Sequence, residues 1–224
     1  MWPDETAALI DLQRRLAAAT PPPFDPVAAA VTGGCFVCFG RGGSGPGQPG
    51  DRGWAAAVAS GPGRLLDTAV VTGPAGDRYR PGLLALREGP LLADAVQALR
   101  IPPDLLLVNA TGRDHPRRAG LALHLGAALD LATVGVTHRP LLATGPMPAL
   151  MPGATAPLLL DGEHVGDWLR SRAGTRPIVV HAAWRTDPEV ARTAVLAVCR
   201  GHRTPAPIRE ARRLAREARS AATR

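Results

Sequence analysis

The fold is decided by residues 83–136, which have the sequence LLALREGPLLADAVQALRIPPDLLLVNATGRDHPRRAGLALHLGAALDLATVGV. Apolar spacing within this stretch predicts helices over residues 83–99 and 117–131. Residues 105–108 and 133–136 are short apolar runs without polar alternation, which is typical of buried strands in a parallel sheet. This alternation of helices and buried strands predicts an α/β fold in which helices flank a mixed sheet.

Further elements are predicted on both sides of this stretch. An apolar stripe predicts a helix over residues 6–19, and the run TPPPF at residues 20–24 ends it. The strands expected before the stretch cover residues 36–39, 54–60 and 64–71, with a flexible Gly- and Pro-rich hairpin tip over residues 40–53. The elements expected after it are a loop at 139–157, strands at 156–160, 164–170 and 177–181 with a tight turn at Asp161-Gly162, and helices at 188–200 and 208–222.

The length and composition indicate one globular domain. The chain has 224 residues, of which 46% are hydrophobic, and this suffices for a sizeable core. No linker is long enough to divide it. The domain is therefore expected to span residues 1–224, with a helix and linker over residues 1–25 and a basic helix over residues 206–224.

Charge and cysteine content narrow the range of partners and compartments. All 26 basic residues are arginine and the formal net charge is +7. This favours partners that carry phosphates, although a GC-rich genome would produce the same arginine excess. Three cysteines and no recognisable signal peptide indicate the cytoplasm. No apolar run reaches the roughly 18 residues that a membrane span needs, so no membrane partner is expected. Cys35 and Cys38 are predicted on opposite faces of a strand, which disfavours a redox or metal pair.

Two segments resemble a known family. They are Arg78-Tyr79-Arg80-Pro81-Gly82, followed by Glu88, and residues 109–126 with the sequence NATGRDHPRRAGLALHLG. They resemble the endonuclease V family, whose members nick nucleic acid near deaminated bases. The resemblance implies a ribonuclease-H-like fold, in agreement with the predicted order of three strands, helix, strand, helix, strand and helix.

The resemblance implies a site for the deaminated base. Tyr79 corresponds to a tyrosine that enters the base stack as a wedge, although an exposed turn tyrosine is the simpler alternative. Small and apolar residues correspond to the pocket for the extruded base, and Ala110 replaces a glycine at its rim. The expected nucleic-acid-binding residues are Tyr79, Arg78, Arg80, Pro81, Gly82, Leu84, Gly112, Arg117, Arg118, Gly120 and Leu121.

The segment His115-Pro116-Arg117-Arg118 corresponds to the His-Pro-Arg segment of the family. Proline suits the first turn of a helix, so the two arginines are expected beside a positive helix end that favours a phosphate. His115 is expected either to touch the scissile region or to cap the loop.

The family's metal site is only partly matched. The resemblance implies three carboxylates that bind Mg²⁺ or Mn²⁺, of which Glu88 matches one. Asn109 stands at a second position, and Phe36, or Cys35 after a shift of one residue, stands at the third. The expected catalytic positions are Glu88, Asn109, Phe36, His115 and His138, the last replacing a lysine, while Trp184 replaces a histidine.

One carboxylate makes a poor Mg²⁺ site. Cleavage is therefore predicted to be weak or absent, with Glu88 as the sole expected metal ligand. Asp114 and Asp67 are the carboxylates that could rebuild a site.

The C-terminal helix carries regularly spaced arginines. Arg209, Arg212, Arg213, Arg216 and Arg219 recur at intervals of three or four residues and are expected on one face. This face is either solvated and paired with Glu210 and Glu217, or a contact for a nucleic-acid backbone.

Three functions follow from these observations. The first is a protein that binds DNA or RNA containing inosine but has lost metal chemistry, a pseudoenzyme. The second is an active endonuclease that hydrolyses a phosphodiester near the deaminated base in DNA repair. The third is a partner-binding relic without a nucleic-acid role.

Overall fold

The computed structural model describes residues 2–26, 30–40 and 45–222. Within this part of the chain, the eight strands are β1 Thr32–Phe39, β2 Arg52–Gly61, β3 Arg64–Pro74, β4 Leu105–Val108, β5 Ala132–Thr137, β6 Thr155–Leu160, β7 Glu163–Leu169 and β8 Ile178–Ala182. The helices are α1 Thr6–Ala18, α2 Leu84–Gln97, α3 Leu121–Leu129, α4 Pro188–Cys199 and α5 Ala206–Ala221.

All the strands belong to one mixed sheet, in the order β3-β2-β1-β4-β5-β8-β7-β6. β1, β2 and β3 are antiparallel neighbours, while β4 runs parallel to both β1 and β5. β8, β7 and β6 complete the sheet with antiparallel pairs. This confirms the predicted α/β, ribonuclease-H-like architecture. The register pairs Cys35 of β1 with Val108 of β4, so the residues that follow β4 lie beside the second half of β1.

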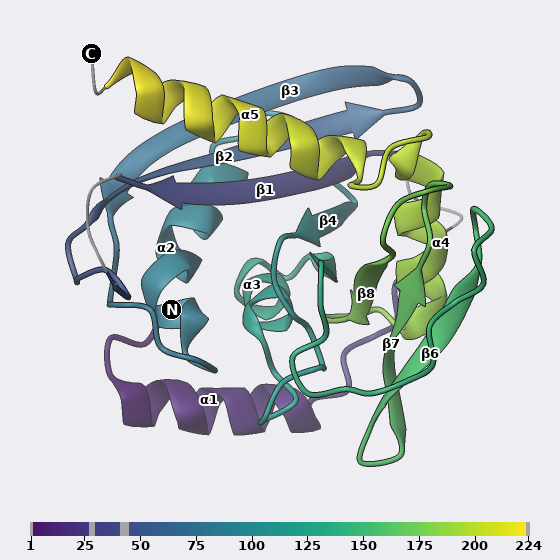
Figure 1. Cartoon of the computed structure of the whole chain (residues 1–224). Coiled ribbons are helices and arrows are strands. Elements are labelled where there is room, and N and C mark those ends of the chain that lie inside the picture. The colour runs from purple at the N-terminus through teal and green to yellow at the C-terminus, as the bar shows by residue number, and fades with distance from the viewer. Residues whose placement is uncertain (1, 27–29, 41–44, 223–224) are drawn as a thin grey trace.

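Helices cover both faces of the sheet (Figure 1). α2 and α3 pack on one face, with α1 against them, and their core includes Cys35, Leu106 and Leu123. α4 and α5 pack on the other face, where α5 lies across β1 and β2 (Figure 1). Because both faces are covered, β2 is buried almost throughout and is built largely of alanine.

The beginning of α5 approaches β1 very closely. A Cβ atom on Gly34 would lie only 2.5 Å from the carbonyl carbon of Pro207, so no larger residue fits there without displacing the helix. This contact brings the rest of α5 over the second half of β1.

Most predicted elements are confirmed within a few residues, but the helix over 117–131 was wrong at its start. α3 begins at Leu121, with Gly120 as its N-cap. The preceding residues form a turn in which the Arg118 amide donates to the His115 carbonyl at 2.9 Å, and Arg118 has a φ of 56°. Left-handed backbone of this kind interrupts a helix, so Pro116 does not occupy its first turn.

Two local predictions are confirmed. Asp161 and Gly162 have φ values of 50° and 80° and join β6 to β7, as a two-residue hairpin turn requires. Cys35 packs in the core under α2, whereas Cys38 packs with Trp54 under α5. The expected hairpin tip at 40–53 includes residues 41–44, which lie outside the described residues, as do residues 223–224 at the end of the predicted basic helix. None of the described helices combines the length and apolar content that crossing a membrane requires.

Candidate functional site

Two adjoining cavities lie beside β1 and the residues that follow β4. The Glu88 cavity has a volume of about 300 Å³, and its walls include Cys35, Glu88 and Asn109. The Gly82 cavity has a volume of about 180 Å³, and its walls include residues of the loops before α2 and α3. Tyr79, Leu84 and Asn109 line both. A group bound in one cavity would therefore lie next to a group bound in the other.

The Gly82 cavity is lined by several of the residues expected to bind nucleic acid. Gly82, Leu84 and Leu121 line it, together with Ala110 at the position where a glycine was expected. Gly120 and Gly112 stand behind this wall, because the Gly120 amide donates to the Gly112 carbonyl at 2.8 Å. The structure thus brings together residues that the sequence separates by about forty positions.

The turn that carries Tyr79 is held by the carbonyl of Gly82. This oxygen accepts hydrogen bonds from Arg117 Nη2 at 2.7 Å, Gln13 Nε2 at 3.2 Å and His115 Nε2 at 3.2 Å. Gly82 has a φ of 74°, a conformation that favours glycine. Tyr79 is 49% exposed, so the hydrogen-bonded turn presents an accessible aromatic side chain.

His115 caps this loop. Its Nδ1 accepts from the Arg117 amide at 3.2 Å, which leaves Nε2 as the donor to Gly82. Burial, and then the charge of Arg117, lower the pKa of His115 to about 4, so the ring is neutral near pH 7. Of the two alternatives, the geometry favours loop capping over contact with a scissile bond.

Arg117 and Arg118 do not lie at a helix start, which corrects their expected place. Arg117 Nε donates to Gln13 Oε1 at 2.6 Å, so this guanidinium is engaged in the Gly82 turn. Arg118 pairs with Asp161 at 3.1 Å and Glu163 at 3.3 Å in the β6–β7 hairpin. Both groups have intramolecular partners because the loop, rather than α3, contains them.

The arginines beside Tyr79 differ from one another. Arg80 pairs with Asp77, which stabilises the chain before the turn. Arg78 is exposed, and its amide donates to Asp77 Oδ1 at 2.7 Å. Pro81 lies between Arg80 and Gly82 in the same turn, where the Leu83 amide donates to the Arg80 carbonyl at 3.0 Å.

The Glu88 cavity has one carboxylate. No described residue forms a hydrogen bond with the side chain of Glu88, and burial raises its pKa to about 7 although Arg87 acts in the opposite direction. Burial, and then Glu88, raise the pKa of the Cys35 thiol, so the thiol stays neutral. Cys35 therefore faces Glu88 from β1.

Phe36 lines the Glu88 cavity next to Cys35 and also reaches the α5 face of the sheet. Its ring packs against the core under α5, with the guanidinium carbons of Arg212 and Arg216 at 5.1 and 5.8 Å from the ring centroid. Both residues named for the first metal position therefore line the Glu88 cavity, and the assignment of either one stays a prediction. Side chains alternate along a strand, so the Cys35 thiol and the Phe36 ring point to opposite faces of the sheet.

The residues in the Glu88 cavity do not fit Mg²⁺ or Mn²⁺. Mg²⁺ requires charged oxygen ligands to offset its dehydration, whereas this cavity contains one carboxylate, one neutral thiol and one amide. No group of three or more His, Cys, Asp or Glu side chains suited to a metal ion occurs in the described part of the chain.

The other carboxylates named from the sequence have different partners. Asp114 is fully buried and accepts the amides of residues 141–143 at 2.6, 2.8 and 2.8 Å. Asp67 accepts the amides of Arg100 and Ile101 at 2.6 and 3.1 Å. Both groups anchor loops, so neither supplies the missing ligands.

Asn109 has an arginine as its neighbour. Its side-chain oxygen accepts from Arg212 Nη2 of α5 at 3.1 Å. His138, which follows β5, lies in the same region: burial, and then Arg203 and Arg212, lower its pKa.

Trp184 lies apart from these residues. Its backbone amide donates to Thr133 Oγ1 at 3.2 Å, and its side chain packs against the core on the α3 face.

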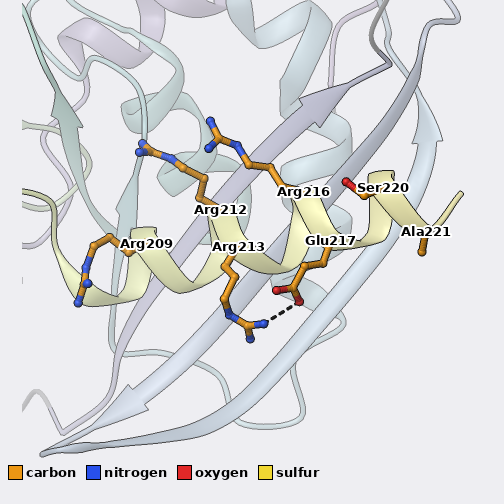
Figure 2. Close-up of a pocket in the computed structure, with 7 residues that line it drawn as sticks. All are labelled: Arg209, Arg212, Arg213, Arg216, Glu217, Ser220 and Ala221. Carbon is orange, nitrogen blue, oxygen red and sulfur yellow. Dashed lines mark hydrogen bonds and ion pairs between the residues drawn. The ribbon is translucent and has the colours of Figure 1, made fainter. Parts of the chain in front are cut away.

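The C-terminal arginines do not act as one face. Arg213 pairs with Glu210 and Glu217, whereas Arg219 Nη1 donates to the Phe39 carbonyl at 3.2 Å. Arg212 and Arg216 point from α5 to the opposite side from Arg213 (Figure 2). The expected solvated, paired face is therefore that of Arg213. Arg212 and Arg216 instead lie against the Phe36 ring.

Gln13 was missed by reasoning from sequence. It is 1% exposed although it is polar, and it connects α1 to the Gly82 turn through two hydrogen bonds. The available signal was a glutamine within the apolar stripe of the N-terminal helix, between Leu9 and Leu16. A polar residue in such a stripe needs a buried partner.

Comparison with known proteins agrees with this geometry. The Endonuclease V family model matches residues 47–213. The chain belongs to the endonuclease V family. It is 43% identical to the endonuclease V of Nocardia farcinica over 160 residues, which cover 70% of each chain.

Solved endonuclease V structures have the same fold. The crystal structure from Streptomyces avermitilis has a TM-score of 0.88 and 32% identity, covering 100% of this chain and 96% of that one. The endonuclease V of Ciona intestinalis, solved with a 24mer DNA containing an inosine followed by a ribo-adenosine, has a TM-score of 0.78 and 19% identity over 95% of this chain and 96% of that one. The latter likeness shows the fold alone.

Proposed function

We propose that this chain recognises deaminated bases, above all the hypoxanthine of inosine, in DNA or RNA, and that it does so without metal-dependent cleavage. The observation that carries the proposal is the contrast between adjoining cavities. Several residues expected to bind the base line the Gly82 cavity, whereas the Glu88 cavity has one carboxylate.

Base recognition is supported by the size and lining of the Gly82 cavity. Its volume of about 180 Å³ is below the roughly 300–1,000 Å³ of pockets for drug-sized ligands, which suits a single extruded base. Tyr79 lines the same cavity with a half-exposed ring. Such a ring can stack where a base has left the helix and so offset part of the unstacking cost. The Ciona relative was solved with inosine-containing DNA.

Loss of cleavage is supported by the donors in the Glu88 cavity. Metal-dependent hydrolysis needs a cation that activates water and stabilises the leaving oxygen. Glu88 alone supplies negative charge, because Asn109 is neutral and burial keeps the Cys35 thiol protonated. We therefore propose neither Mg²⁺ nor Mn²⁺ as a cofactor.

An active endonuclease is the second candidate. It is favoured by Glu88 itself, a buried carboxylate at the family position whose side chain has no hydrogen-bond partner among the described residues. A partner or substrate that supplied further oxygen ligands would complete a site around it.

A paired binding and cleavage assay tests the proposal. Single- and double-stranded DNA and RNA with one inosine are compared with the same strands that carry adenosine or guanosine there. We expect selective binding of inosine and no nicking with Mg²⁺ or Mn²⁺. Equal affinity for all bases would refute base recognition, and nicking that Glu88→Ala abolishes would establish the second candidate.

Variants of Tyr79 test the wedge within the same assay. Base–aromatic stacking contributes about 1–3 kcal/mol per base, so Tyr79→Ala should weaken inosine binding about 5- to 150-fold. Tyr79→Phe retains the ring and should bind within about twofold of the unmodified protein. Unchanged binding by Tyr79→Ala would exclude the wedge.

A further inference from the structure

Two arginines of α5 lie beside the Glu88 cavity. Arg212 and Arg216 are one helical turn apart and extend from the same side of α5 (Figure 2). Both guanidinium groups lie within cation–π distance of the Phe36 ring, and Arg212 also donates to Asn109. Two positive groups are thus held side by side next to a residue that lines both cavities.

The charges of these arginines are not neutralised by the protein. Arg213, their neighbour on α5, pairs with Glu210 and Glu217 at 2.5 and 2.6 Å. No carboxylate in the described part of the chain pairs with Arg212 or Arg216. Burial, and then the charge of Arg216, lower the pKa of Arg212, so the two groups repel one another. Arg212 Nε is also buried without a hydrogen-bond partner among the described residues.

We propose that Arg212 and Arg216 form a binding site for one backbone phosphate of the nucleic acid, with guanidinium charge in the region where family members would use a metal ion. Guanidinium groups match phosphate oxygens as planar, bidentate donors. The inference rests on the proposed base recognition, because Asn109 connects this site to the Gly82 cavity. The anion beside an extruded base is a phosphate of its own strand.

The amide at position 109 preserves the positive charge of Arg212. An aspartate there would pair with Arg212 and neutralise it. Asn109 instead accepts a hydrogen bond and orients the guanidinium without cancelling its charge, which leaves that charge available to a ligand. The Asn109 amide and the Arg212 guanidinium therefore belong to one site. A guanidinium holds a phosphate but supplies no activated water, so the site binds and does not hydrolyse.

The test compares charge removal at neighbouring positions of α5. Arg212→Gln and Arg216→Gln each remove one positive charge and keep a hydrogen-bond donor. Arg213→Gln is the matched control, since it removes the same charge from the same helix at a neutralised position. Binding to inosine-containing and inosine-free oligonucleotides is measured in EDTA over a range of salt concentrations, with thermal melting as the check on folding.

We expect Arg212→Gln and Arg216→Gln each to weaken binding about tenfold, by the same factor for both oligonucleotides, and to reduce the salt slope by about 1. Asn109→Asp should act in the same direction, while Arg213→Gln stays within about twofold. The proposal is overturned if Arg212→Gln and Arg213→Gln have equal effects.

A separate readout distinguishes failure of this site from failure of base recognition. Inorganic phosphate is titrated into the unmodified protein while the arginine Nε–Hε signals are followed by NMR. Saturable shifts of Arg212 and Arg216, absent for Arg213, support the site even if inosine is not preferred. If these two signals do not move, the phosphate site is refuted whatever the base selectivity.

Discussion

The Gly82 cavity and the Glu88 cavity share three residues but differ in how their polar groups are satisfied. In the first, one backbone carbonyl receives three donors from α1 and from the loop before α3. In the second, a buried carboxylate faces a neutral thiol, and the neighbouring amide contacts an arginine.

A recognition pocket and a metal site depend on different parts of the structure. A recognition pocket depends on backbone geometry, which many contacts stabilise together. A metal site depends on a few charged side chains, so substitution of two of them would remove the cation and leave the fold in place.

The largest expected effect comes from rebuilding the carboxylates. Cys35→Asp combined with Asn109→Asp places three acidic groups around the Glu88 cavity. Because a ligand that binds only the folded state stabilises it, Mg²⁺ should raise the melting temperature of this variant by several degrees (about 1–3 kcal/mol) and leave that of the unmodified protein unchanged. A Mg²⁺-dependent rise in the melting temperature of the unmodified protein would show that its Glu88 cavity already binds the cation.

The next effect tests the rigidity of the Gly82 cavity. Gly82→Ala forces a side chain into left-handed backbone, which costs about 1–2 kcal/mol, and its Cβ would lie 3.2 Å from Arg117 Nη2. We expect inosine binding to fall about tenfold or more. Gly162→Ala is the matched control, since its φ is 80° and the space around it is open: it should lose similar stability, measured by urea unfolding, and bind normally.

A smaller effect is expected at the link between α1 and the cavity. Gln13→Ala leaves Arg117 Nε without its buried acceptor and should lower the free energy of unfolding by about 1–3 kcal/mol. Gln97→Ala, at an exposed position near the end of α2, should change it by less than about 0.5 kcal/mol. If the two variants unfold at the same urea concentration, α1 does not support the cavity.

The last effect is a pH dependence at Glu88. Its pKa of about 7 in the folded protein exceeds the ordinary value of 4.5, so the folded state binds more protons and stability falls as pH rises from about 4.5 to 7. Glu88→Gln removes this term. The variant should match the unmodified protein near pH 4.5 and exceed its free energy of unfolding by about 3 kcal/mol above pH 7. A difference that is constant with pH would show that Glu88 titrates normally.

Local sequence patterns determined several strands, turns and side-chain orientations of this protein. The apolar run at β4, the turn at Asp161-Gly162 and the opposite faces of Cys35 and Cys38 follow from short-range sterics and side-chain alternation. The segments around Tyr79 and His115 sufficed to indicate the family, whose model matches the chain. These features depend on neighbours within a few residues, so the sequence specifies them directly.

Only the tertiary structure decided which side chains share a site. Gln13 meets Gly82 across 69 residues, and Arg212 meets Asn109 across 103. Arg117, expected at a phosphate, is instead engaged within the Gly82 turn. Periodicity and motif spacing describe position along one element, whereas the partner of a buried polar group is set by how separate elements pack. For this reason the sequence indicated the family and the amide at position 109, while the arginine beside Asn109 became evident only in three dimensions.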